Sequence, residues 1–286
     1  MAKRKGAGGS NRARGAAKPA AIEDYETLIV ARRGRALEIT FDRPEKLNAI
    51  SETMAVELMR AMDSVEGDRG VLAVILAGND RAFSAGADLS GQPATPDRYY
   101  DAYRARYNQR PLRRLFGYFA NYTKPVISAV EGYCLGGGFE LAMLGDIIVA
   151  GEGAQFGLPE ARLGLIPGLG GTQCLPRIVG RGLAKELMWT ARRLSAAEAA
   201  RHNVVTHLTR TGGALDKARD IVAQMEGSGP LAIMMIKQAV NRGGELPLPL
   251  AFHQEADLSY LLTFSEDRRE GLEAFAEKRK PVFKGQ

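Results

Sequence analysis

The stretch KPVISAVEGYCLGGGFE, from Lys124 to Glu140, and the shorter FGLPE that ends at Glu160 decide how the rest of this chain is interpreted. The first contains an apolar run, Val126–Val130, which leads through a glycine triplet to Glu140. Such a run is typical of a buried parallel strand. The glycines before Glu140 would offer backbone N–H groups to an adjacent oxyanion. Two carboxylates in one small pocket do not both ionise cheaply, so Glu140 and Glu160 are candidates for general base and general acid.

Strand and helix patterns alternate through the first half of the chain, which predicts an α/β fold with parallel strands. The predicted helix that begins at Ser51 has apolar residues at helical spacing up to Val65. Residues 83–89 are predicted to form a turn of small residues. The predicted strands are 27–31, 36–41, 71–77, 126–130 and 146–150, and the predicted helices are 51–65, 99–120 and 139–144.

The last third of the chain is predicted to be mainly helical. We therefore divide the chain into a basic tail at 1–22, an α/β core at 23–210 and a helical lobe at 211–286. The predicted elements after the core strands are helices at 183–191, 195–202, 214–226, 230–242, 248–263 and 266–277, and one strand at 204–208.

Length and composition exclude several classes of protein. A chain of 286 residues that is 45% hydrophobic can bury a large core. No apolar run reaches the roughly 18–20 residues that span a bilayer, and no signal peptide is recognised. Cys134 and Cys174, the only cysteines, have no metal-ligand spacing, and a reducing cytoplasm is expected. The three histidines also lack ligand spacing, so no metal site is expected. Gly168–Gly171 does not fit a dinucleotide-binding fingerprint, and no cofactor is expected.

The net charge of +6 belongs to the amino-terminal tail. Residues 1–20 hold six of the 39 basic residues and no acidic one, so the remainder balances its 33 acidic residues. The tail is poor in apolar residues and is expected to be disordered. We interpret it as a solvated extension. The alternative is that the tail is an arm that binds RNA or a membrane surface. If it binds RNA, the alternative function is that of an RNA-binding protein built on an enzyme scaffold.

Four motifs together resemble the crotonase (enoyl-CoA hydratase/isomerase) superfamily. They are DRPEKLNA at Asp42–Ala49, FSAGADL at Phe83–Leu89, the long block Lys124–Arg177, and the ending Ser265–Arg279. They occur in the order found in that superfamily and cover about residues 25–284. The resemblance implies a spiral of repeated ββα units with a carboxy-terminal helical lobe that forms trimers, often paired into hexamers. It also implies an acyl-CoA thioester as the substrate. No membrane partner is expected, and nucleic acid is the less favoured partner.

The resemblance further implies a role for individual residues. The N–H groups of Ala87 and Gly137 would hold the thioester oxygen as it becomes an enolate. Glu140 and Glu160 would hold one water, which adds to C3 of a trans-2-enoyl thioester while C2 takes a proton. The further residues that match substrate- or CoA-binding positions are Ala85, Asp88, Gly136, Phe275 and Lys278, of which the last two would reach the CoA of a neighbouring subunit.

Two points stay open at this stage. Retention of both glutamates favours a hydratase, but an enoyl-CoA isomerase or a dehydratase for a polar acyl group such as carnitinyl remains an alternative. The segment 91–123 is rich in tyrosine and arginine and walls the acyl pocket in relatives. Its rings either line such a pocket here or pack between helices with exposed hydroxyls.

Overall fold

The computed structural model describes residues 24–90 and 110–286, and its central feature is a pair of β-sheets. The larger sheet has the strand order β1-β2-β3-β5-β7-β10, and the smaller one β4-β6-β8-β9. Only β1–β2 and β8–β9 pair antiparallel among the described strands. The strands are β1 Leu28–Arg33, β2 Ala36–Phe41, β3 Ala73–Ala77, β4 Ala82–Ser84, β5 Val126–Val130, β6 Tyr133–Leu135, β7 Ile147–Gly151, β8 Gln155–Gly157, β9 Leu194–Ser195 and β10 His207–Thr209.

Successive strands alternate between the two sheets. In each of the pairs β3–β4, β5–β6 and β7–β8, the first strand joins the larger sheet and the second joins the smaller. This repetition confirms the predicted α/β spiral. The helices are α1 Glu52–Glu66, α3 Arg110–Phe119, α4 Gly137–Leu144, α5 Gly171–Val179, α6 Arg181–Thr190, α7 Ala196–Arg201, α8 Ala214–Met225, α9 Pro230–Gly243, α10 Leu248–Leu262 and α11 Glu266–Glu277, with short 3₁₀ helices η1 Pro44–Lys46 and η2 Glu160–Leu163.

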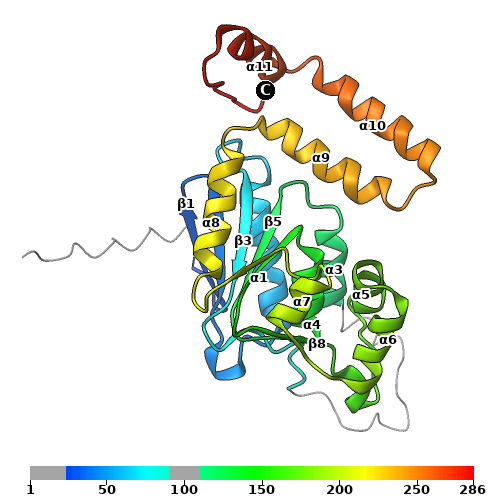
Figure 1. Cartoon of the computed structure of the whole chain (residues 1–286). Coiled ribbons are helices and arrows are strands. Elements are labelled where there is room, and N and C mark those ends of the chain that lie inside the picture. The colour runs from blue at the N-terminus through cyan, green and yellow to red at the C-terminus, as the bar shows by residue number, and fades with distance from the viewer. Residues whose placement is uncertain (1–23, 91–109) are drawn as a thin grey trace, which may run out of the picture.

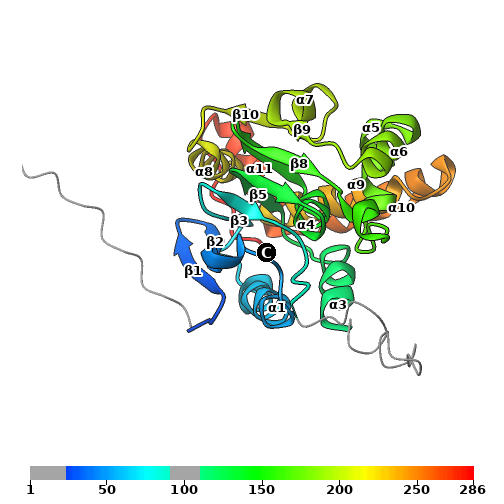
Figure 2. The same ribbon diagram turned by 90° about the horizontal axis from the view of Figure 1, so that it is seen from below.

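The larger sheet is buried on both faces, which explains why its inner strands are continuously apolar. Every residue of β3 and of β5 is buried. One face packs against α8 through small residues such as Ala218, beside Ile75 and Ile127. The other face packs against α1 and, with it, the smaller sheet (Figures 1 and 2). A fully buried isoleucine stabilises the fold by about 1.5–3 kcal/mol, so these buried strands fix the positions of the loops that connect them.

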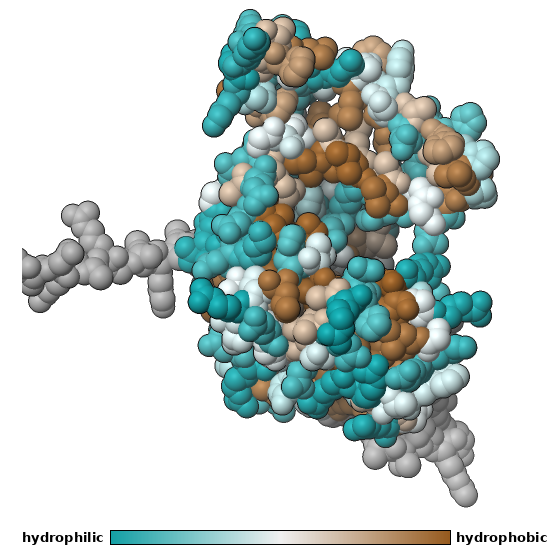
Figure 3. All heavy atoms as spheres, viewed as in Figure 1, coloured by the Kyte–Doolittle hydropathy of each residue, from teal (hydrophilic) through white to brown (hydrophobic). Residues whose placement is uncertain are grey.

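Helices α9, α10 and α11 extend beyond the sheets (Figure 1). Their outer surface is strongly apolar, and hydrophobic residues gather over α9 and α10 in Figure 3. Phe252, Phe264 and Phe275 are 59%, 72% and 85% exposed. Exposed apolar surface on this scale marks an interaction surface. No helix in the described part of the chain is long and apolar enough to cross a bilayer.

Most predicted elements are present, and the differences have simple causes. The predicted turn at 83–89 starts as the end of β4, and the strand predicted at 204–208 lies at 207–209. Strands β6 and β8 and helix α5 were not predicted, because each strand has only three residues and α5 contains Gly171 and Pro176. The tail at 1–22 and the first half of the helix predicted at 99–120 lie outside the described residues, and the second half forms α3.

Candidate active site

The topology brings three loops to one edge of the smaller sheet. Strands β4, β6 and β8 are parallel neighbours, so their carboxyl ends lie side by side. The loop after β4 carries Ala85–Asp88, the turn after β6 carries Gly136 and leads into α4, and the loop after β8 ends at Glu160. The N–H of Gly136 donates to the Gly157 carbonyl at 2.8 Å and ties the last two loops together. Residues far apart in the sequence therefore share one site.

Two backbone amides, those of Ala87 and Gly137, flank one point in this site. A methyl group placed on Gly137 would lie 3.2 Å from the Ala87 nitrogen. Gly137 is the first residue of α4, where an N–H has no intrahelical acceptor and the helix dipole adds positive charge. Within the described residues the Ala87 N–H also donates to no acceptor. Two free donors in this arrangement can stabilise an oxyanion.

The loop that carries Ala87 is fixed by the segment at 43–50. The N–H of Ile50 donates to the Gly86 carbonyl at 2.8 Å, and the N–H of Asp88 donates to the Ile50 carbonyl at 3.0 Å. The carboxylate of Asp88 accepts hydrogen bonds from Ser90 and pairs with Arg43 at 2.8 Å. The Ser90 and Arg43 donors lower the pKa of Asp88 to about 2. Both of its oxygens have protein partners, so the side chain holds the loop in shape.

Glu140 is a buried carboxylate with two backbone donors. It lies in the first turn of α4 and is 2% exposed. Its Oε1 accepts hydrogen bonds from the N–H of Leu169 at 2.8 Å and of Gly171 at 2.7 Å, immediately before and at the start of α5. Burial raises the pKa of Glu140, and the two amides partly oppose that rise. The amides therefore fix the orientation of the carboxylate and support its ionised form.

Glu160 has a different environment. It is the first residue of η2, and in the described part of the chain its buried Oε2 has no hydrogen-bond partner. Its Oε1 would lie 3.0 Å from a methyl group on Gly136, which places it against the turn after β6. Burial raises the pKa of Glu160 to about 7, and the nearby charge of Glu140 adds to the rise. Burial is the larger cause, whereas the sequence suggested repulsion between the two carboxylates.

The raised pKa of Glu160 predicts how stability depends on pH. The folded-state pKa of about 7 exceeds the ordinary value of 4.5, so ionisation of Glu160 destabilises the fold as the pH rises from 4.5 through 7. Each pKa unit is worth about 1.4 kcal/mol, which gives an upper bound of about 3.5 kcal/mol, and solvent screening of this half-buried side chain makes the loss smaller. Glu160→Gln is expected to remove this loss. Urea unfolding at pH 4.5 and pH 8 measures it, and an equal pH dependence in variant and wild type contradicts the expectation.

The remaining candidates are placed as follows. Ala85 lies at the start of the oxyanion loop, where its N–H donates to the Leu47 carbonyl at 2.9 Å. Phe275 and Lys278 are exposed on and after α11, which Figure 1 shows above α9 and away from α5 and α6. One chain alone does not bring them to the glutamates. Asp146, which directly precedes β7, has a structural role: it accepts a hydrogen bond from the Val126 N–H at 2.7 Å and pairs with Lys237 at 2.8 Å.

The sequence interpretation missed the role of Leu169 and Gly171. The available signal is the glycine-rich segment Gly168–Gly171, which ends where α5 begins and leaves backbone N–H groups free to bind a carboxylate. In the described ranges no group of three or more His, Cys, Asp or Glu side chains could hold a metal ion.

The aromatic segment is only partly described. Phe119 and Tyr122 are buried, and the hydroxyl of Tyr122 donates to the Met62 carbonyl at 3.0 Å. The hydroxyl of Tyr118 donates to Asp63 at 2.6 Å. These rings pack against α1, as the helix-packing interpretation of the segment predicted, but the hydroxyl of Tyr122 is buried and not exposed as that interpretation expected. The tyrosines at 99, 100, 103 and 107 lie outside the described residues.

Comparison with known protein families shows to which family this chain belongs. A family model described as enoyl-CoA hydratase/isomerase matches residues 32–286. The chain belongs to the enoyl-CoA hydratase/isomerase family. The resemblance inferred from the four sequence motifs is thereby confirmed, and the chain is an enzyme of this family.

Individual members of the family support the assignment along nearly the full chain. A probable enoyl-CoA hydratase of Rhizobium meliloti (strain 1021) is 42% identical over 262 residues, which cover 91% of this chain and 98% of the relative. The 2,3-dehydroadipyl-CoA hydratase of Escherichia coli (strain K12) is 38% identical over 258 residues, which cover 90% of this chain and 98% of that relative. A crystal structure of enoyl-CoA hydratase subunit I from Geobacillus kaustophilus HTA426 matches with a TM-score of 0.85 and 35% identity, covering 92% of this chain and 100% of that chain.

Proposed function

We propose that this chain is an enoyl-CoA hydratase, which adds water across the 2,3 double bond of a trans-2-enoyl-CoA thioester. One observation carries the proposal: Glu140 and Glu160 lie in unlike environments beside the free amides of Ala87 and Gly137. An isomerase needs one proton-transferring group that moves a proton along the substrate. Addition of water needs a base for the water and an acid for carbon, and two carboxylates with different environments fit that division.

The environments suggest which glutamate takes which role. Glu140, oriented by the Leu169 and Gly171 amides, takes the proton of the water that attacks C3. Glu160, whose Oε2 has no donor facing it in the described residues and whose pKa is raised to about 7, gives a proton to C2. The two amides hold the enolate oxygen, and such a preorganised donor is typically worth about 3 kcal/mol in the transition state.

The proposal extends to binding and assembly. Ala85, Asp88 and Gly136 would form the wall beside the thioester and CoA, with Phe275 and Lys278 supplied by a neighbouring copy. The apolar outer surface of α9–α11 favours a homotrimer or homohexamer. The acyl-CoA is the substrate, and the proposed chemistry uses no cofactor. A role in fatty acid metabolism and a cytoplasmic location, which suits two free cysteines, complete the proposal.

Turnover of enoyl-CoA thioesters tests the function. We expect crotonyl-CoA and longer enoyl-CoA substrates to lose their conjugated absorbance in the presence of the enzyme and to yield 3-hydroxyacyl-CoA. Product analysis separates the alternatives, because an isomerase yields a shifted double bond without an added oxygen. A dehydratase for a polar acyl group would act on that group and leave crotonyl-CoA unchanged. Absence of hydration across short, medium and aromatic enoyl-CoA substrates would overturn the proposal.

A further inference from the structure

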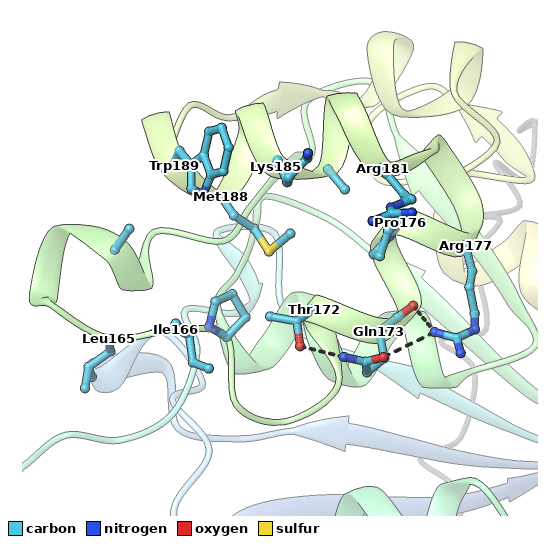
Figure 4. A pocket seen from close by; sticks show the side chains of 13 residues that line it. Leu165, Ile166, Thr172, Gln173, Pro176, Arg177, Arg181, Lys185, Met188 and Trp189 are labelled. Carbon is cyan, nitrogen blue, oxygen red and sulfur yellow. Dashed lines mark hydrogen bonds between the residues drawn. The ribbon is translucent and has the colours of Figure 1, made fainter.

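A pocket of about 670 Å³ lies beside the catalytic loops, between α5, α6 and the segment that follows Glu160. Its volume is in the range that holds a drug-sized ligand. Figure 4 shows its walls: Trp189, Met188, Lys185 and Arg181 line it from α6, while Leu165 and Ile166 line it from the opposite segment.

The interior of the pocket is apolar and open to solvent. Ile166 is 75% exposed and Trp189 is 73% exposed. No part of the described chain covers these two side chains, although they are among its largest apolar groups. Concave, exposed apolar surface bordered by polar groups is the usual character of a binding site.

The border of the pocket is positively charged. Three cations line it, and none of its lining residues is acidic. Arg177 is already neutralised, since its guanidinium pairs with Glu245 at 3.1 Å. Arg181 and Lys185 have no acidic partner in the described residues, and the Nζ of Lys185 lies 5.6 Å from the centre of the Trp189 ring. Four residues apart on α6, they lie on one face of the helix and present two uncompensated charges to the same ligand.

We propose that this pocket binds an apolar chain that ends in a carboxylate. The chain would lie against Ile166, Met188 and Trp189, and the carboxylate would accept hydrogen bonds from Arg181 and Lys185. The site also adjoins the glutamates. Ala161, which lines the pocket, follows Glu160 directly, and Thr172, also in the wall, follows the glycine whose N–H binds Glu140.

Two sources supply this chemistry. One is a free medium-chain carboxylate, whose binding does not depend on the reaction that the enzyme catalyses. The other is the far end of an acyl chain that carries a terminal carboxylate while its thioester occupies the oxyanion site, and this source rests on the proposed function. The experiment below treats them in separate arms.

The first arm uses Trp189, the only tryptophan in the chain, as a reporter of the pocket. Octanoate added to the full-length protein is expected to change the tryptophan emission in a saturable way. Octylamine and octanol, with the same chain but no carboxylate, are expected to bind about tenfold more weakly or not at all. This arm needs neither a variant nor catalytic activity, so it stays informative if the proposed hydration is absent.

Variants then test the charges. Arg181→Gln and Lys185→Gln are each expected to weaken octanoate binding by about fivefold to tenfold. Arg201→Gln, which removes an exposed charge of α7 outside the pocket, is the matched control and is expected to bind as the wild type does. All three positions lie on helix surfaces, and circular dichroism confirms that the variants fold.

The second arm compares kcat/KM for a medium-chain enoyl-CoA with and without a terminal carboxylate. A selective loss for the carboxylate-ended substrate in Arg181→Gln identifies the acyl chain as the source. Unchanged selectivity together with octanoate binding identifies the free carboxylate. The proposal is overturned if octanoate leaves the emission unchanged and selectivity is also unchanged, or if octanol binds equally well. It is also overturned if a second copy of the chain buries Trp189, seen as emission that a soluble quencher cannot reach.

Discussion

Glu160→Gln is expected to lower kcat for hydration of a trans-2-enoyl thioester by about 10²–10⁴-fold, the usual range for loss of a positioned acid or base. Glutamine has nearly the same shape but cannot give a proton to C2, while KM should change little because the acyl-CoA contacts remain. Glu140→Gln is expected to cause a loss of the same order. Its amide oxygen can still accept from the Leu169 and Gly171 amides, so the loss would reflect chemistry and not a collapsed loop.

The chain offers a matched control for these variants in Glu131. This side chain also accepts two backbone hydrogen bonds on one oxygen, from Gly212 at 3.0 Å and Ala214 at 3.2 Å, and its other oxygen is buried without a described partner. Glu131 directly follows β5, and its carboxylate binds the amides at the start of α8, outside the site. Glu131→Gln is therefore expected to retain wild-type kcat, measured by loss of enoyl absorbance. Turnover near the wild-type rate by Glu140→Gln or Glu160→Gln would contradict the proposed role of that glutamate as base or acid.

The acidity of Glu160 also gives this reaction a pH dependence. Since Glu160 must hold a proton to protonate C2, hydration kcat is expected to fall as the pH rises through about 7.

Several elements of the fold could be predicted from the sequence. Strands β2 and β5 and helix α11 have the predicted bounds, because β2 and β5 are mainly apolar runs and α11 begins after the capping residue Ser265. The smaller sheet could not be predicted from such patterns, since β6 and β8 have three residues each and are held by their neighbours. This difference matters because β4, β6 and β8 assemble the site.

The glutamates and glycines of the site were visible in the sequence, but the unlike environments of Glu140 and Glu160 were not. Those depend on where α5 begins, and α5 is rich in poor helix formers. Its first turn is stabilised by the carboxylate of Glu140 at its amino terminus. The pocket beside α6 could not be predicted either, because Ile166 and Trp189 line the same pocket only after α5 and α6 have folded.

Gly137→Ala is expected to lower kcat/KM by about 10²–10³-fold, because the added methyl group would lie between the two oxyanion donors. It would stand 3.2 Å from the Ala87 nitrogen and 3.4 Å from Leu169 Cδ1, which is tight but requires a shift of only a few tenths of an ångström. Gly137 lies within α4 and does not have a positive φ, so alanine suits its backbone. The donors act mainly on the enolate-like transition state, so the loss should appear chiefly in kcat.

Two other glycines separate blockade of the site from loss of the fold. Gly67, at the end of α1, has no atom within 4 Å of an added methyl group, so Gly67→Ala is expected to keep wild-type activity and stability. Gly138→Ala would press a methyl group to 2.6 Å from the Ser84 carbonyl oxygen and is expected to lower the unfolding temperature as well as activity. The unfolding temperature of Gly137→Ala should match that of Gly67→Ala, whereas its turnover should be as low as that of an inactive enzyme. A folded Gly137→Ala variant with wild-type kcat/KM would mean that the enolate oxygen is held elsewhere.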